Sequence, residues 1–386
     1  MKVKKNIHNY EICGTPYLLP AGQGIMEHIK GLSTNEVGIA LWEMLEQGCE
    51  KEELLDYMMK RFEASDEERP ILLKDLNAYL TNLKNHGFFD TPLYEPEPSD
   101  PVRLVTIGPL SIHLRIPEAV FQSFFSAFSA PSQASDNAAD QSITFCRHFP
   151  PSYPTGQVLV RSDEVLIMDT EKQYVILPLK GHYVHEIHCS KDGAIAKIYG
   201  WYEETADCHE ELLSALRFPF LILAQQKGLC VMHSASLLYH GYAFLFSGHS
   251  GVGKSTHVQL WQDNFGITWI NGDLNLLGIK SGQAFCYGLP WCGTSGISTP
   301  GEFPLGGITF LKKAPYNKVT ALSREQFTLL LAQRMITPNW DTAMMQESLS
   351  TAEELSSRIL GFRLECTKDS KAAHTMKAAI DNALHD

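Results

Sequence analysis

The segment GHSGVGKS, residues 248–255, constrains the fold more than any other part of the chain, because such a loop needs a strand before it and a helix after it. Glycines let the loop adopt positive φ angles, so that successive backbone N–H groups converge on phosphate oxygens. The apolar run YAFLFSG predicts the strand, and STHVQLWQDNF predicts the helix. We therefore expect an α/β unit around a phosphate-binding loop; a glycine turn that binds no nucleotide is the alternative.

The same segment satisfies the pattern G-x-x-x-x-G-K-[S/T] in full, with Gly248 as its first glycine. In this pattern the lysine reaches the β and γ phosphates, and the hydroxyl that follows it ligates Mg²⁺. A nucleotide and Mg²⁺ are therefore the expected ligands. The residues expected to bind the nucleotide are Gly248, His249, Ser250, Gly251, Val252, Gly253, Lys254, Ser255 and Thr256.

Two more residues are candidates for the chemistry. Asp273 follows the apolar run ITWING, where a carboxylate beside the loop can hold Mg²⁺ together with Ser255 or take a proton from an attacking hydroxyl. A solvated turn residue or a helix cap is the alternative for this aspartate. His233 lies in the first strand of a predicted hairpin that turns at His240–Gly241, and a lone histidine in a strand more often has a structural role.

Three large side chains further along the chain have two interpretations each. Trp291 and Trp340 either stack on an adenine ring or fill a core, and core packing is favoured. Arg334, in AQRMITP, either stabilises the charge of phosphoryl transfer or is an ordinary surface arginine, and the surface position is favoured.

Residues 10–90 predict a compact unit of their own. Two short apolar runs around Gly14–Pro16 predict a β-hairpin. Ser33 and Glu36 have the spacing of a capping box that opens the first helix, and Gly87 has the position of a C-terminal cap on the third. The three helices are expected at residues 34–47, 51–62 and 71–86.

The middle of the chain contains a linker and many strands. The segment DTPLYEPEPSDP, rich in proline and acids, predicts a stiff linker, and SAPSQASDNAADQS predicts a mobile surface loop. Eight β-branched or alternating runs predict strands over residues 102–200, and CHEELLSALRFPFLILAQQKG predicts a helix. The expected division is an N-terminal domain at 1–90, a linker at 91–101, a strand-rich lobe at 102–224 and a C-terminal domain with the phosphate loop at 225–386.

Charge and composition narrow the classes of partner. The 386 residues carry a formal net charge of −12, which disfavours nucleic acid and anionic membranes as partners. The chain has neither a signal-peptide pattern nor an apolar run long enough to span a bilayer, so we expect a cytoplasmic protein. The nine cysteines form no CxxC pair, which favours reduced, packed thiols over a zinc or redox site.

The spacing of His233, the GHSGVGKST loop and Asp273 resembles the catalytic domain of the HPr kinase/phosphorylase family, which is related in its phosphate loop to phosphoenolpyruvate carboxykinase. The resemblance covers about residues 225–385. It implies that Lys254 and Ser255 bind ATP and Mg²⁺, that Asp273 is a general base or metal ligand, and that His233 orients Asp273. It also implies a serine hydroxyl as the phosphoryl acceptor.

Two departures from that family bear on the activity. The family has tandem aspartates at the strand end, whereas Gly272 stands in the first of those positions here. One carboxylate must then serve as both base and metal ligand, or another group must assist it. The segment YGLPWCGTSGIS is instead similar to a Gly-x-Pro-Trp-x-Gly segment of kinase-like proteins from peptide-maturation gene clusters. Reverse phosphorolysis is therefore not expected.

The N-terminal unit resembles PqqD-like domains, in its hairpin, its helix order and the final LKNHGFF. The resemblance implies a domain that captures the leader segment of ribosomally made, modified peptides by adding a peptide strand to its small sheet. A winged-helix-like module with another role is the alternative.

Together these patterns predict an α+β multidomain protein: a small winged-helix-like PqqD-type domain, a strand-rich lobe and an α/β P-loop domain like that of HPr kinase. The predicted activity is ATP- and Mg²⁺-dependent phosphorylation of a Ser or Thr hydroxyl in a precursor peptide, with other peptide-maturation enzymes as further partners. One alternative is a kinase or ATPase acting on free serine or a carboxylate. Another is a non-catalytic, ATP-gated peptide chaperone. The sequence specifies no oligomeric state.

Overall fold

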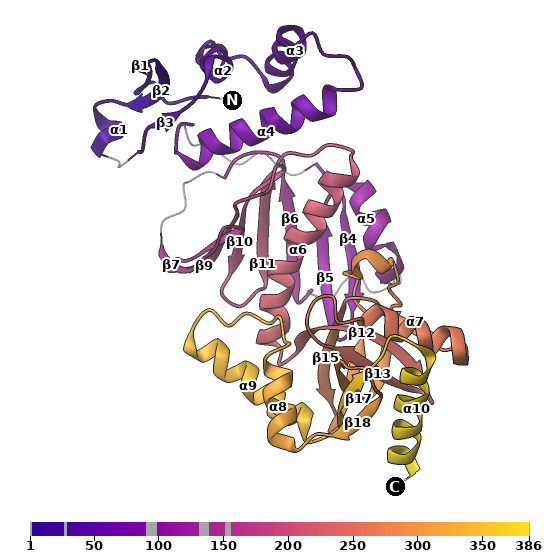
Figure 1. Ribbon diagram of the computed structural model, residues 1–386. Coiled ribbons are helices and arrows are strands. Elements are labelled where there is room, and N and C mark those ends of the chain that lie inside the picture. Colours follow the sequence, from indigo (N-terminus) through magenta and orange to yellow (C-terminus); the bar gives the residue numbers. More distant parts are fainter. Residues whose placement is uncertain (1, 27–28, 90–98, 131–138, 151–155, 386) are drawn as a thin grey trace.

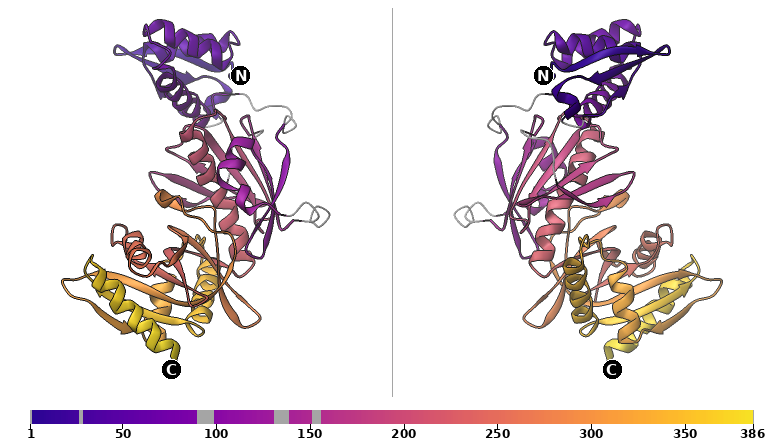
Figure 2. Two further views of the ribbon diagram at one scale, coloured as in Figure 1. Left: turned by 90° about the vertical axis from the view of Figure 1, so that its right-hand side faces the viewer. Right: turned by 90° about the vertical axis from the view of Figure 1, so that its left-hand side faces the viewer.

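A computed structural model of the chain describes residues 2–26, 29–89, 99–130, 139–150 and 156–385. Figure 1 shows three parts in a row: an N-terminal helical unit, a strand-rich lobe and a C-terminal unit that contains the phosphate loop. The two turned views of Figure 2 show the same arrangement, with the first and last parts at opposite ends. The predicted α+β, multidomain fold class is confirmed. None of the described helices is long and apolar enough to span a membrane.

The N-terminal unit is a small sheet covered by helices, as predicted. Its strands are β1 (Ile7–Ile12), β2 (Thr15–Pro20) and β3 (Leu32–Ser33), and its helices are α1 (Gln23–Met26), α2 (Glu36–Glu46), α3 (Lys51–Arg61) and α4 (Arg69–Asn85). The β1–β2 hairpin turns at Cys13 and Gly14, both with positive φ angles. Trp42 and Leu76 are fully buried in the core between the helices.

The prediction that Ser33 caps the first long helix, α2, is wrong. Ser33 pairs with Tyr17 in the sheet, so its side chain does not cap the helix. Asn35 is the N-cap instead, and its side-chain oxygen accepts a hydrogen bond of 2.8 Å from the N–H of Gly38. The helix therefore begins at Glu36, two residues later than expected. At the other end of the unit, Gly87 has the positive φ angle that was predicted after α4.

The strand-rich lobe is one eight-stranded sheet in the order β4-β5-β6-β11-β10-β9-β8-β7. Its strands are β4 (Val102–Ile107), β5 (Leu110–Arg115), β6 (Gln141–Cys146), β7 (Gln157–Arg161), β8 (Val165–Asp169), β9 (Gln173–Pro178), β10 (Val184–Ser190) and β11 (Ile195–Gly200). The eight strands and the long helix α6 (Ala206–Gln226) match the prediction, and a short helix α5 (Glu118–Phe124) was not foreseen. The proposed linker and the low-complexity loop lie mostly outside the described residues.

The C-terminal unit is built on the predicted hairpin of β12 (Cys230–Tyr239) and β13 (Tyr242–Ser247), which turns at His240–Gly241. The other strands are β14 (Thr268–Asn271), β15 (Leu274–Lys280), β16 (Gln283–Tyr287), β17 (Glu302–Lys313), β18 (Lys318–Ala321) and β19 (Leu360–Cys366). The helices are α7 (Lys254–Phe265), α8 (Arg324–Ala332), α9 (Thr342–Ser356) and α10 (Ser370–His385). Because β13 also pairs with β17, five strands close into a ring: β13, β12, β15, β16 and β17.

One hydrophobic core joins the strand-rich lobe to the C-terminal unit. It contains residues of the lobe sheet such as Ile198, residues of α6 such as Phe220, and residues of the C-terminal unit such as Leu274 and Trp291. Helix α6 therefore packs on both parts. This shared core fixes the position of α6 relative to the phosphate loop.

The N-terminal unit docks on the lobe through charged groups that are buried. The ammonium of Lys84 on α4 forms an ion pair with the Glu186 carboxylate on β10, and both side chains are almost fully buried. Glu186 is also 2.9 Å from Nε2 of His188. Lys51 on α3 donates a 2.8 Å hydrogen bond to Glu203, shortly before α6. These contacts hold the N-terminal unit against the lobe independently of the segment that links them in sequence.

Candidate nucleotide-binding and catalytic site

The phosphate loop has the strand–loop–helix setting that its sequence predicts. It connects the end of β13 at Ser247 to the start of α7 at Lys254. Gly251 has a φ angle of +70°, and Gly253, directly before α7, has one of +109°, which glycine adopts without the strain a side chain would bring. The free N–H groups at the start of α7 thus adjoin the loop, an arrangement that binds phosphate groups.

The predicted nucleotide-binding residues differ in exposure. His249, Ser250, Gly251, Ser255 and Thr256 are exposed, Val252 and Gly253 are intermediate, and Gly248 and Lys254 are buried. Gly248 is closely packed, because a β-carbon there would lie 2.9 Å from Val252 Cγ1 and 3.1 Å from the Leu311 oxygen. The loop therefore offers exposed donors above a tightly packed base.

The structure brings His233 and Asp273 into contact. His233 Nε2 lies 2.8 Å from Asp273 Oδ1. The backbone on both sides is fixed: the Ser234 N–H donates to the Asp273 carbonyl at 2.8 Å, and the Ser247 hydroxyl donates to the His233 carbonyl at 2.7 Å. Residues of β12, of the end of β13 and of the β14–β15 turn thus meet beside the start of the phosphate loop.

A buried polar network, which sequence reasoning missed, fixes the direction of Asp273. The Asn271 side-chain oxygen accepts hydrogen bonds from the N–H groups of Asp273 and Leu274, at 2.8 and 3.1 Å. The Asn275 amide donates to the Ser234 carbonyl at 2.7 Å. Buried amides need partners, so each side chain has one favoured orientation. The signal in the sequence was two asparagines in the otherwise apolar run INGDLNLL.

Opposing effects set the protonation of the charged groups. The hydrogen bond from His233 lowers the pKa of Asp273, burial raises it, and the charges of Lys254 and Arg217 lower it further, with a net decrease. Asp273 is therefore a carboxylate at neutral pH. Burial lowers the pKa of Lys254, and Asp273 opposes that effect. Lys254 makes no hydrogen bond or ion pair with any described residue, which suits a cation whose partner is a bound anion.

Gly272, where the resembled family has an aspartate, lies in a place with no room for a side chain. A β-carbon there would lie 2.0 Å from Ser295 Oγ and 2.5 Å from Ser295 Cβ. The Ser295 hydroxyl is itself held by a 2.7 Å hydrogen bond to the Cys292 carbonyl. A second aspartate would thus require the segment around Ser295 to move, so the site is built for one carboxylate.

The expected metal ligands, Ser255 and Asp273, have the chemistry that Mg²⁺ prefers. Among the described residues, no three His, Cys, Asp or Glu side chains lie close enough to hold a metal ion together. Ser255 and Asp273 supply hard oxygen ligands, and Mg²⁺ is typically bound by one or two protein groups together with phosphate oxygens and water. The residues present therefore fit a magnesium ion that is carried by a nucleotide.

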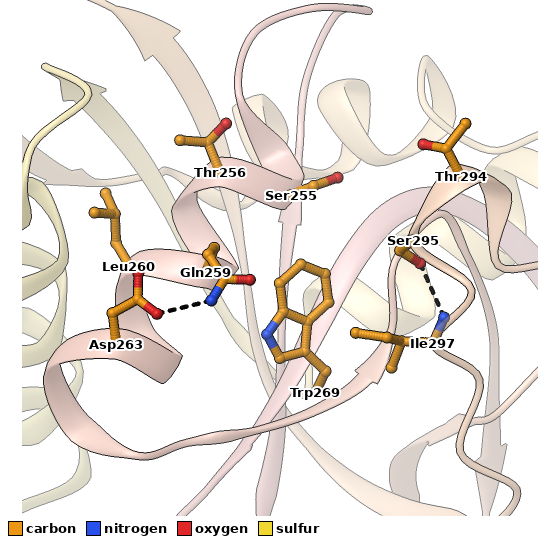
Figure 3. Close-up of a pocket in the computed structure, with 9 residues that line it drawn as sticks. All are labelled: Ser255, Thr256, Gln259, Leu260, Asp263, Trp269, Thr294, Ser295 and Ile297. Atoms are coloured by element: carbon orange, nitrogen blue, oxygen red, sulfur yellow. Dashed lines mark hydrogen bonds between the residues drawn. The ribbon is translucent and has the colours of Figure 1, made fainter.

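A pocket of about 470 Å³ opens beside the first turns of α7 (Figure 3). It includes Trp269, whose side chain is only 6 % exposed and whose Nε1 has no hydrogen-bond partner among the described residues. In Figure 3 the indole lies between side chains of α7 and those of Ser295 and Ile297. The residues that line the pocket are Ser255, Thr256, Gln259, Leu260, Asp263, Trp269, Thr294, Ser295 and Ile297.

The two tryptophans singled out from the sequence lie elsewhere. Trp291 packs against Phe220 with ring centroids 4.9 Å apart, and its Nε1 donates to the Leu213 carbonyl at 2.8 Å. Trp340 packs edge-on against Tyr174, 5.1 Å away. Core packing, the favoured interpretation, is confirmed for Trp291. Sequence reasoning missed Trp269, although it lies only four residues before Asp273.

Arg334 is not the ordinary surface residue that was favoured. Its guanidinium lies 2.9 Å from Nε2 and 3.1 Å from Nδ1 of His249, in the phosphate loop. Its carbonyl accepts a hydrogen bond from the His233 N–H, so the backbone before Met335 runs beside β12. Its charge also acts on Lys254, whose pKa it lowers.

These features define the C-terminal unit as a P-loop unit with a histidine–aspartate pair beside the loop. The PqqD family, described as coenzyme PQQ synthesis protein D, matches residues 25–88, so the predicted resemblance of the N-terminal unit is confirmed. Among solved structures, the Hpr(Ser) kinase/phosphatase from Coxiella burnetii is similar to 40% of this chain and 95% of its own, with 10% identity and a TM-score of 0.23. The predicted family does appear there, but so weak a likeness supports no argument. No curated protein matches the chain.

Proposed function

We propose that the protein is an ATP- and Mg²⁺-dependent kinase that phosphorylates a Ser or Thr hydroxyl of a ribosomally made precursor peptide. One observation carries the proposal: Lys254, a buried lysine with no hydrogen bond or ion pair to any described residue, adjoins a phosphate loop and the His233–Asp273 pair. A cation for the phosphates and a residue that accepts the proton of the hydroxyl are two groups that recur in sites of phosphoryl transfer. The PqqD-like domain supports a peptide as the acceptor.

In the proposed mechanism the substrate hydroxyl attacks the γ-phosphorus while its proton passes to Asp273. The bond from the γ-phosphorus to the bridging oxygen breaks, and ADP leaves. His233 occupies Asp273 Oδ1, which leaves Oδ2 to accept the proton. Lys254 and the loop N–H groups carry the charge that develops on the phosphate oxygens. Mg²⁺, held by Ser255 and Asp273 when bound, supplies further neutralisation of the phosphates.

We assign the pocket beside α7 to the nucleoside of ATP. The γ-phosphate belongs at Lys254 and Asp273, so the phosphate chain leads past Ser255 and Thr256 into that pocket. Trp269 lines this pocket and offers part of an aromatic ring against which a purine can pack. The change Trp269→Phe should weaken ATP binding severalfold and leave inorganic triphosphate binding unchanged, as calorimetry would measure. The matched change Trp261→Phe, at a buried residue of α7 outside the pocket, should change the binding of neither ATP nor inorganic triphosphate.

We propose that the leader segment of the peptide binds to the small N-terminal sheet. Both outer strands of this three-stranded sheet, β1 and β3, pair only with β2 among the described residues, so each leaves a strand edge for addition. Other enzymes that mature the same peptide are the further partners proposed. In this proposal the chain comprises a leader-binding domain at 1–90, a linker at 91–101, a strand-rich lobe at 102–224 and a catalytic domain at 225–386. The nine free cysteines support a reducing compartment such as the cytoplasm.

The deciding experiment incubates the full chain with ATP, Mg²⁺ and the precursor peptide encoded beside its gene. Mass spectrometry should find one added phosphoryl group on a Ser or Thr. The variants Lys254→Ala and Asp273→Asn should lose the transfer and keep leader binding, whereas Lys227→Ala, on the surface, should resemble the wild type. A peptide that binds but never gains a phosphoryl group would refute the kinase.

One observation favours a second candidate, an ATP-gated peptide chaperone without catalysis. Gly272 and Ser295 leave room for a single carboxylate where the resembled family has two. Tight ATP binding that changes the affinity for the leader, with no γ-phosphate released, would select this candidate. Release of γ-phosphate to free serine or to a carboxylate would instead select the small-molecule kinase.

A further inference from the structure

Arg217, in the middle of α6, has an environment that the proposed chemistry does not yet use. Its side chain is partly buried, and it makes no hydrogen bond or ion pair with any residue in the described ranges. A guanidinium carries five N–H donors and stays charged at any physiological pH. The Arg217 guanidinium thus keeps unused donors at a partly buried position, where an anionic ligand can accept them.

The packing of α6 places Arg217 next to the catalytic aspartate. Trp291 Nε1 donates to the carbonyl of Leu213, one turn before Arg217 and on the same face of the helix. Two residues after Trp291, a β-carbon at Gly293 would lie 2.9 Å from Asp273 Cβ. The segment from Trp291 to Gly293 therefore contacts this face of α6 at one end and Asp273 at the other.

The charges around Asp273 do not balance without a ligand. Arg217 and Lys254 both act on the Asp273 carboxylate, and Arg334 acts on Lys254. Burial lowers the pKa of Arg217, and the charge of Asp273 opposes this decrease. Two cations thus act on one carboxylate and a third acts on Lys254, which is an excess of positive charge that a triphosphate would neutralise.

We propose that Arg217 donates hydrogen bonds to the γ-phosphoryl group of ATP and stabilises its charge while it is transferred, an inference that rests on the proposed function. As the acceptor oxygen–phosphorus bond forms and the bond to the bridging oxygen breaks, negative charge spreads over the γ oxygens and the leaving ADP. A planar guanidinium matches two of those oxygens at once. The strand-rich lobe, which has no motif of its own, would thereby supply a catalytic residue to the site through α6.

The test compares Arg217→Ala and Arg217→Lys with Lys227→Ala, a control at the end of the same helix. Removing a donor aimed at developing charge costs about 100- to 1,000-fold in kcat. We expect that loss of kcat for Arg217→Ala, with a smaller change in KM for ATP. Arg217→Lys should lose only part of the activity, because lysine keeps the charge but cannot donate to two oxygens at once from a planar guanidinium. Millimolar guanidinium should restore part of the activity of Arg217→Ala. Unchanged kcat in both variants would overturn the inference.

Binding measurements separate this inference from the kinase proposal. On the full chain with Mg²⁺, Arg217→Ala should weaken inorganic triphosphate by about tenfold or more and leave ADP, which lacks the γ-phosphate, unchanged. If this result is found but no peptide is phosphorylated, the proposed kinase function is refuted, while the proposed contact between Arg217 and the γ-phosphate is supported. Equal weakening of both ligands, or a fall in the thermal midpoint that accounts for the lost activity, would show a structural arginine and overturn the inference.

Discussion

At Asp273, a hydrogen bond from His233 outweighs burial and keeps the carboxylate ionised. A carboxylate with a lowered pKa stays charged as the pH falls, so the activity should persist to acid pH before it declines. Removing the partner should raise the Asp273 pKa toward its ordinary range and move the acid limb of the kcat/KM profile to higher pH.

His233→Ala and His233→Gln test this expectation by the pH dependence of peptide phosphorylation. The alanine variant should move the acid limb upward, whereas the glutamine variant, which keeps an N–H donor, should move it less. Acid limbs that coincide in the wild type and both variants would show that the pair does not control the titration.

Gly272 is the residue at which the chain departs from the resembled family, and the contact with Ser295 explains why. Gly272→Ala places a β-carbon against Ser295 Oγ, so it should lower the free energy of unfolding by about 1–3 kcal/mol. The double variant Gly272→Ala/Ser295→Gly removes the obstructing side chain and should recover most of that loss. Urea denaturation of the three proteins measures both effects; a single variant as stable as the wild type would contradict the expected clash.

At the scale of elements, the sequence predicted those turns and helices whose structure depends on residues close together in the chain. The glycines of the phosphate loop, the hairpin turn at His240–Gly241 and the apolar periodicity of α6 each specify a structure over a few residues, and each was predicted. The ring closed by β13 and β17 was not, because it depends on strands far apart in sequence. For the same reason Trp269 was missed and the surface interpretation was favoured for Arg334, since only tertiary packing brings these residues to the loop.

At the start of α2, two polar residues compete to cap the helix. Two polar residues stand before the helix, and the sheet uses Ser33 while the helix uses Asn35. Asn35→Ala should therefore lower the free energy of unfolding by about 1 kcal/mol. Ser33→Ala should change it much less, because the pairing of β3 uses backbone groups. Chemical denaturation of both variants measures the difference, and a larger effect at Ser33 would restore the predicted capping box.

At the scale of the whole molecule, the buried pair Lys84–Glu186 joins the PqqD-like domain to the strand-rich lobe. Burial pushes the pKa of Lys84 well below its ordinary range, so the charged form depends on its partner. Lys84→Met leaves the buried Glu186 with His188 in place of its lysine partner and should cost about 3–5 kcal/mol in the free energy of unfolding.

The double variant Lys84→Met/Glu186→Gln removes both charges and should recover most of that stability, as denaturation midpoints would show. A single variant with wild-type stability would mean that the two charges separate easily and that the domain is only loosely docked. Stable docking in the double variant would show that the ion pair specifies the arrangement more than it strengthens it.

Helix α6 has a consequence for the peptide that the protein is proposed to modify. Its first turn lies near the PqqD-like domain, where Asp207 is 3.8 Å from Lys74, and further along the helix Arg217 is close enough to Asp273 for the two charges to interact. The ten residues between Asp207 and Arg217 span about 15 Å at 1.5 Å per residue. An extended peptide covers about 3.3 Å per residue. A peptide that runs along α6 from its first turn to Asp273 would therefore need about five extended residues to cover this length of the helix, and this sets a spacing between the captured leader and the hydroxyl that is phosphorylated.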